Sequence, residues 1–230
     1  MAKIYSYIIP TDDGAAPNPY GGVCTLTICK PAIRRTATEG CWIIGTGSKR
    51  TKLRDGLTYD FSKSLVYAMK VTDKKTLKEY DEHCRKSLRV KIPNWQSGRF
   101  KKRMGDCIYD YSSGVTPNQR EGVHGPGNSS TDLHGKNALL STHFYYFGSK
   151  PVQIPDELHH IIHTTQNCKL IRDKETLTTF EKWIQQYDKN RIYAEPQQKY
   201  KFENGADEFC RTECSNQRLK NNQGKNDSVC

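Results

Sequence analysis

The chain has 230 residues, with 36 Lys and Arg residues against 25 Asp and Glu residues and a formal net charge of +11. This charge attracts polyanions, and the 13 Tyr, 7 Phe and 3 Trp residues exclude a wholly disordered chain. No apolar run approaches the roughly 20 residues that span a bilayer, and the apolar stretch at the start is too short for a secretory signal. The sequence therefore predicts a cytoplasmic protein, or a nuclear one in a eukaryote, with no membrane contact and with its nine cysteines reduced.

The first part of the chain alternates short β-rich runs with turns. A strand is expected at 3–9, followed by a loop rich in Gly and Pro, and the next β-rich run lies at 23–29. A short helical turn is expected at 31–39, because a proline at position 31 favours the first turn of a helix. Further strands are expected at 41–44 and 65–71, with a basic segment between them.

Helical spacing first appears in the middle of the chain. Apolar residues at positions 77, 80, 84 and 88 recur at that spacing and predict a helix that is capped by Thr72 or Asp73. A strand is expected at 106–111. The polar segment 112–137 is longer than an ordinary connection, which favours a functional or mobile loop. Residues 138–147 are expected to form one strand or a bent pair of strands.

Two more helices are expected towards the end of the chain. The first lies near 155–162, and the second has apolar residues at 177, 180, 184 and 187 and is capped near Asp173. We expect one domain at 1–195 and a polar, weakly ordered tail at 196–230. The order of strands and helices predicts an α+β fold, with a mixed, largely antiparallel twisted sheet or partial barrel flanked by helices.

Four blocks of sequence, in order along the chain, carry a family resemblance. They are APNPYGGVCTLTICKPAIRR at 16–35, WIIGTGS at 42–48, GDCIY at 105–109 and NALLSTHFYYFG at 137–148, with Ile154 and Pro155 nearby. Together they cover about residues 3–165, and the chain resembles the nucleotide modification associated domain, type 2. One position departs from the family: Gly40-Cys41-Trp42 stands in place of the expected Gly-Asp-Trp, so no role passes to a carboxylate there.

The resemblance implies a link to systems that make, remove or recognise modified bases in DNA. The short strands and the Gly-x-Trp-Ile-Ile-Gly block are also similar to the small β-barrels of modified-base readers related to the PUA domain. The expected partner is therefore DNA or a nucleotide, and no cofactor is expected. The oligomeric state cannot be inferred from the sequence.

The same blocks supply candidate nucleotide-binding residues. Glycines let the backbone approach a ligand closely, basic side chains bind phosphate, amides bind a base edge, and aromatic rings stack on bases. The candidates are Asn18, Tyr20, Lys30, Arg34, Trp42, Gly45, Gly47, Ser48, Tyr109, Lys136, Asn137 and Tyr145. Ordinary turns, a solvated basic face and an aromatic core explain the same residues, because no phosphate loop of the Gly-x4-Gly-Lys type is present.

Candidate catalytic residues lie in the long polar loop. His124, Asp132 and His134 supply an acid and a base for proton transfer, although solvated loop residues have the same composition. His159 and His163 have the i and i+4 spacing of a metal site on a helix, but zinc proteases require a Glu where His160 stands. A polar helix face is therefore expected there, and no metal.

Three functions fit these features. The first is a binding module that reads a modified nucleotide in DNA. The second is an enzyme that acts on a modified base or its nucleotide through a His/Asp acid-base pair, and the third is an interaction protein that contacts an acidic partner. Turnover distinguishes the enzyme from the binding module. An interaction protein for an acidic partner should show no preference for nucleic acid over other polyanions.

Overall fold

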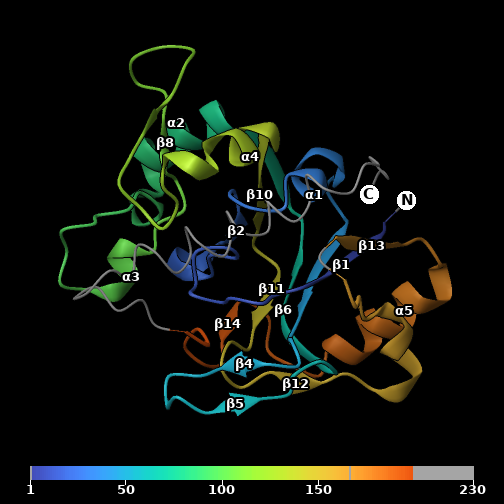
Figure 1. Ribbon diagram of the computed structural model, residues 1–230. Helices are drawn as coiled ribbons and strands as arrows, with labels where there is room; N and C mark the ends of the chain where they lie inside the picture. The colour runs from blue at the N-terminus through green and yellow to red at the C-terminus, as the bar shows by residue number, and fades with distance from the viewer. Residues whose placement is uncertain (1, 166, 199–230) are drawn as a thin grey trace, which may run out of the picture.

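A mixed sheet of seven strands crosses the middle of the protein in the computed structural model, which describes residues 2–165 and 167–198. The strand order is β13-β1-β3-β6-β11-β14, and β12 also pairs with β6 (Figure 1). The strands are β1 Ile4–Ile8, β3 Trp42–Thr46, β6 Ser64–Lys70, β11 Phe144–Tyr146, β12 Val152–Gln153, β13 Cys168–Ile171 and β14 Arg191–Ile192. The pairs β1–β3 and β11–β14 are parallel and the others are antiparallel, so the sheet is mixed and mostly antiparallel.

A smaller antiparallel sheet of three strands and two short hairpins complete the β-structure. The smaller sheet has the order β2-β10-β7, with β2 Cys24–Leu26, β7 Asp73–Thr76 and β10 Asn137–Ser141. The hairpins are β4 Thr51–Lys52 with β5 Thr58–Tyr59, and β8 Tyr109–Asp110 with β9 Asn118–Gln119. The segment 138–147 is therefore a pair of strands, of which the first joins the smaller sheet and the second joins the larger one.

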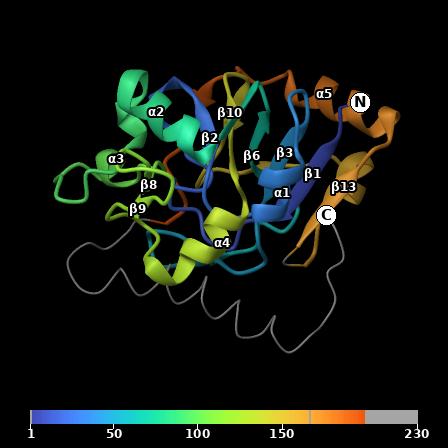
Figure 2. The ribbon, with the colours of Figure 1, turned by 90° about the horizontal axis from the view of Figure 1, so that it is seen from above.

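Helices lie on both sides of the larger sheet. The α-helices are α1 Pro31–Thr36, α2 Leu77–Ser87, α3 Phe100–Arg103, α4 Ser129–His134 and α5 Lys174–Ile184. The short 3-10 helices are η1 Tyr20–Gly22, η2 Arg89–Lys91, η3 Pro126–Asn128 and η4 Asp156–Ile161. Seen from above, α5 lies on one side of β1, β3 and β6, and α1 and α4 lie on the other (Figure 2). Among the described residues, no helix is both long and apolar enough to cross a membrane.

Each face of the larger sheet buries its own set of side chains. Tyr5 and Tyr67 point to the face covered by α1 and the smaller sheet, whereas Trp42 and Tyr145 point to the face covered by α5 and η4. This division follows from the alternation of side chains along a strand. Because both faces are covered, the central strands are almost continuously apolar, as is usual for a sheet that is buried on both sides.

The predicted α+β class is confirmed. Of the two predicted alternatives, a twisted sheet and a partial barrel, the structure has the sheet. β13 and β14 lie at opposite ends of the strand order, so the larger sheet is open and is not closed into a barrel. The predicted cap of α2 is wrong, because Asp73–Thr76 pairs with β10 as a strand and the helix begins later. Thr76 caps α2 by accepting from the Glu79 N–H, whereas Asp173 caps α5 as predicted.

The structure describes only the beginning of the predicted tail at 196–230. Pro196 and Gln197 are buried, and the Gln197 N–H donates to Asp12 Oδ2 at 3.2 Å. Residues 199–230 lie outside the described part of the chain, so the weakly ordered tail and the domain boundary at 195 stay predictions.

Candidate active site

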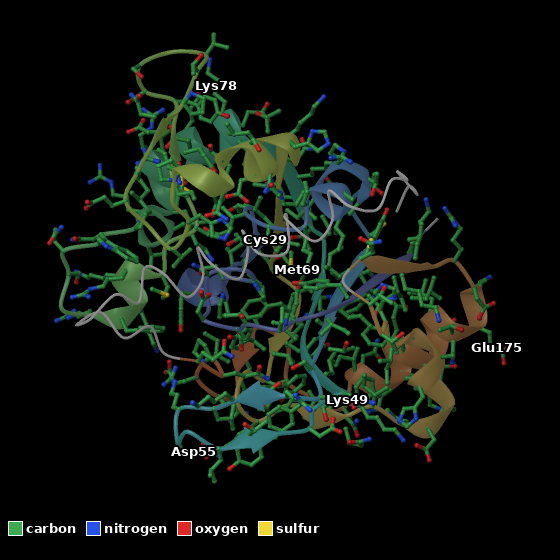
Figure 3. All side chains as sticks on the ribbon, viewed as in Figure 1. Cys29, Lys49, Asp55, Met69, Lys78 and Glu175 are labelled. Carbon is green, nitrogen blue, oxygen red and sulfur yellow. The ribbon has the colours of Figure 1, made fainter. Side chains whose placement is uncertain are left out.

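The loop between β2 and α1 places a cysteine thiol in a strained turn. Cys29 and Lys30 both have positive φ angles, 57° and 40°, which non-glycine residues adopt only at a cost. The turn is held in place because the Cys29 N–H donates to Asp132 Oδ1 at 2.8 Å. Cys29 is half-buried, and it lies near the middle of the view in Figure 3.

A histidine joins this thiol to a carboxylate. His124 precedes η3, and Asp132 lies in α4. The His124 Nε2 atom lies 3.4 Å from Cys29 Sγ, and the Nδ1 atom lies 2.6 Å from Asp132 Oδ2. A thiol, an imidazole and a carboxylate in this order are the constellation of nucleophilic acyl-transfer enzymes, in which the imidazole takes the proton of the nucleophile and the carboxylate orients the imidazole.

Buried groups fix the carboxylate of this set. The Tyr109 hydroxyl donates to Asp132 Oδ2 at 3.0 Å. The Arg34 guanidinium, which is fully buried, donates to the main-chain carbonyls of Asp132 and Thr27. Arg34 belongs to α1 and Asp132 to α4, so this side chain ties together the two elements that flank the thiol. Position 135 must be glycine, because a Cβ there would overlap the Arg34 guanidinium.

The histidine is held through its main chain and its surroundings. The Gln119 side-chain amide donates to the His124 carbonyl at 2.7 Å, so the hairpin β8–β9 supports the loop that carries His124. Three residues that adjoin the set, Ile28, Val123 and Leu133, pack in one hydrophobic cluster. The residues next to the thiol, the imidazole and the carboxylate are therefore packed in the same hydrophobic cluster, which fixes the three groups relative to one another.

The charges around the set favour an ionised Asp132. Burial opposes ionisation, yet the pKa of Asp132 lies below its ordinary value, because His124, Arg34 and the Cys29 N–H all stabilise the carboxylate. A second buried acid, Asp13, lies close enough to His124 for the two charges to interact, and burial raises the pKa of Asp13. An ionised Asp132 favours the imidazole tautomer that carries its proton on Nδ1, which leaves Nε2 able to accept a proton from the thiol.

Two of the three predicted catalytic residues come together, and the third does not. His124 and Asp132 are in direct contact, whereas His134 is exposed at the end of α4, where its main-chain carbonyl accepts from Arg35 at 3.3 Å. Sequence reasoning did not find Cys29. The available signal was a cysteine in a chain that also has His and Asp residues elsewhere, a pattern that the presence of nine cysteines obscures.

Several predicted nucleotide-binding residues surround this set. Tyr109 and Arg34 contact Asp132, and the Asn137 side chain donates to the Arg34 carbonyl at 3.2 Å. The Lys30 ammonium lies 4.5 Å from the centre of the Tyr7 ring. Tyr20 packs in the same hydrophobic cluster as Tyr109.

Other predicted nucleotide-binding residues lie away from the set. Trp42 and Tyr145 are buried on the opposite face of the larger sheet. Asn18 is buried, and its side chain donates to the Met104 carbonyl at 2.7 Å and accepts from the Lys91 ammonium at 2.8 Å. Lys136 is exposed. The predicted residues therefore do not gather around one hollow.

The glycines of the second sequence block serve the packing of the sheet. A Cβ at Gly45 would overlap Ile9 and Tyr67, and a Cβ at Gly47 would overlap the backbone of Phe61. Ser48 lies 3.1 Å from the Thr51 hydroxyl, as measured between the two side-chain oxygens. These positions are thus explained by close packing at the end of β3.

The described residues contain no group of three or more His, Cys, Asp or Glu side chains arranged to hold a metal ion. In η4 the histidines turn to different partners: His159 Nε2 lies 3.0 Å from the Ile154 carbonyl, and His160 Nε2 lies 2.9 Å from the Thr176 hydroxyl.

The family model for nucleotide modification associated domain 2 matches residues 1–204, which is most of the chain. The match includes all three members of the thiol, imidazole and carboxylate set. No curated protein and no solved structure was found to match the chain.

Proposed function

Because the chain belongs to the nucleotide modification associated domain 2 family, we propose that it is a thiol-dependent enzyme of a DNA-modification system that removes an acyl group from a modified nucleotide. One observation carries the catalytic part of this proposal. It is the unbroken series of contacts from Cys29 Sγ to His124 Nε2 at 3.4 Å, and from His124 Nδ1 to Asp132 Oδ2 at 2.6 Å.

The reaction uses these three side chains in sequence. His124 Nε2 accepts the thiol proton, and Cys29 Sγ attacks the carbonyl carbon of an amide or ester. The tetrahedral intermediate collapses, the bond to the leaving amine or alcohol breaks, and His124 returns the proton to that leaving group. A water molecule, deprotonated by His124, then attacks the thioester and releases the acid and the free thiol. One water is consumed, and Asp132 keeps the imidazole oriented throughout.

The substrate class follows from the chemistry of the set together with the family. A thiol paired with an imidazole and a carboxylate acts on carbonyl carbons, and an acyl group attached to a base offers such a carbon outside the ring. The hypothesis of a binding module without catalysis has weaker support, because Trp42 and Asn18, which were expected to hold the base, are buried in internal contacts.

Selective alkylation tests the nucleophile. We expect iodoacetamide at neutral pH to modify Cys29 at least about tenfold faster than Cys168, a half-buried cysteine that serves as the internal comparison. Peptide mass spectrometry of the full-length protein measures both rates. His124→Ala should remove the difference, because the thiol then lacks the base that takes its proton.

Turnover tests the reaction. Nucleosides and oligonucleotides that bear amide-linked or ester-linked acyl groups on the base are incubated with the protein, and the released acid is quantified by mass spectrometry. We expect Cys29→Ala to lower the rate by about 10³-fold or more, and Cys168→Ala to leave it unchanged. Equal turnover by the wild type and Cys29→Ala, or a Cys29 that reacts no faster than Cys168, would refute the proposal. Tight binding of these compounds without turnover would instead favour the binding module.

A further inference from the structure

We propose that a basic pocket on the surface, between the hairpin β4–β5 and α3, binds the phosphate backbone of a polynucleotide strand. This inference rests on the proposed function only in taking a nucleic acid as the carrier of the modified nucleotide. The pocket has a volume of about 520 Å³ and is lined by Arg54, Arg99, Phe100, Lys101, Lys102 and Glu195. Four cations thus face one carboxylate.

The positive charge of the pocket is largely uncompensated within the fold. Lys101 pairs with Glu195 at 3.4 Å, and both of these side chains are about half exposed. In the part of the chain that the structure describes, Arg54, Arg99 and Lys102 form no ion pair with a carboxylate. All three are exposed. Like charges held at one pocket repel one another, so an anion that enters the pocket is stabilised by all of them.

The basic surface continues beyond the pocket. Three more exposed cations lie beside Arg54 along the chain: Lys52 in β4 of the same hairpin, and Lys49 and Arg50 directly before β4. Figure 3 shows Lys49 and Asp55 at opposite ends of this hairpin, so the cations run along its length and not only at the pocket. A mononucleotide is too small to contact most of these cations. A strand with regularly spaced phosphates can contact many of them at once, and we therefore assign a polynucleotide to this surface.

One packed cluster connects the pocket to the catalytic set. The Phe100 ring lines the pocket, with the Arg54 guanidinium 5.8 Å from the ring centre, and it also packs against the cluster that contains Ile28 and Val123. Ile28 adjoins Cys29, and Val123 adjoins His124. A strand bound at the pocket is therefore held in a fixed relation to the thiol, because both rest on the same buried side chains.

Charge reversal at the pocket tests this assignment. The full-length triple variant R54E/R99E/K102E is compared with a control variant, K78E/K86E/K182E, which reverses three exposed lysines on other helices and changes the net charge equally. Binding of fluorescent single-stranded and duplex oligonucleotides is measured by anisotropy at several salt concentrations, with a mononucleotide and heparin as competitors. Thermal unfolding of each variant establishes that it is folded.

The two triple variants should separate clearly. We expect the pocket variant to lose at least about tenfold in oligonucleotide affinity at about 0.1 M salt. The slope of log affinity against log salt should become shallower by about 2 for single strands and about 3 for duplexes, as for the loss of three phosphate contacts. The control variant should lose less than about threefold. Equal losses in both variants, or no loss in the pocket variant, would overturn the assignment. If a mononucleotide competes as well as an oligonucleotide, the assignment of a polynucleotide strand as the ligand is wrong.

The outcome is distinguishable from a failure of the proposed function. Cys29→Ala should bind the oligonucleotides as the wild type does, since the thiol is not part of the pocket. An unreactive Cys29 combined with strand binding that depends on the pocket would reject the catalytic proposal and retain this one.

Discussion

Replacement of Asp132 by Asn perturbs the candidate site with the least change of shape. The carboxylate accepts from the Cys29 N–H through Oδ1 and contacts His124 Nδ1 through Oδ2. An asparagine that keeps its oxygen towards Cys29 turns its NH₂ group towards His124. Because that group can only donate, His124 must then accept at Nδ1 and carry its proton on Nε2, the atom that faces the thiol.

The size of the effect follows from this change of tautomer. An imidazole with its proton on Nε2 cannot accept the thiol proton, and the equivalent change in a Ser-His-Asp triad costs on the order of 10⁴ in kcat, which is about 5 kcal/mol of activation free energy. We expect Asp132→Asn to lower turnover, and the alkylation rate of Cys29, by about 10³-fold or more. The free energy of unfolding should fall by only about 1–3 kcal/mol, because the side chain keeps its packing.

The assay combines the two rates with a stability measurement. Turnover of an acylated nucleoside and alkylation of Cys29 are measured for the wild type and for Asp132→Asn, and urea unfolding is followed by circular dichroism. Asp156→Asn is the matched control, since the Asp156 side chain is 96% exposed. A folded Asp132→Asn protein whose rates stay within about threefold of the wild type would show that Asp132 does not set the tautomer of His124.

Two further substitutions test buried positions of the fold. Burial raises the pKa of Asp12 to about 6, against about 3.9 in the unfolded chain, so its contribution to stability is complete below about pH 4 and is lost as the pH rises through 6. Asp12→Asn should therefore lower the unfolding free energy at about pH 4, relative to its value at about pH 7, by about 2 kcal/mol, and urea unfolding that gives the wild-type difference between the two pH values would contradict this. Gly135→Ala should destabilise the protein by about 2–4 kcal/mol, because the new Cβ displaces the buried Arg34. Gly98→Ala is its control, since a Cβ there meets no atom within 4 Å, and equal melting temperatures for the two variants would count against the role of Arg34.

The sequence predicted the parts of the fold whose local signals agree with their tertiary setting. The strand at 65–71 and the helix α5 have strong apolar patterns, and Asp173 is a good N-cap residue. The sequence did not predict β13, because the strand has only four residues and is too short to show alternation, and Ile171 is its one buried residue. It also missed the hairpin β4–β5, whose two-residue strands bury only the Thr51 side chain. Short edge elements owe their structure to their pairing partners, which a local pattern does not contain.

The candidate site was only partly predictable for a related reason. His124 and Asp132 lie 8 residues apart in one polar loop, so composition alone drew attention to them. Cys29 lies 95 residues before His124, and no local pattern connects the two. His134 was included only because of its place in the same loop. Burial was the other missing quantity, because residue type suggests that Trp42 and Asn18 bind a base, whereas their depth in the fold assigns them to internal contacts.

The main-chain link between Cys29 and Asp132 has a consequence for the third member of the set. The amide of Cys29 donates directly to Asp132, so each of the three residues contacts the other two. Cys29 and Asp132 therefore keep their relative positions when the imidazole of His124 is removed. His124→Ala should therefore leave a vacancy with the shape of an imidazole ring, and the site should not collapse. Free imidazole supplied in the buffer matches that vacancy in size and chemistry, so the general base can be returned from outside the chain.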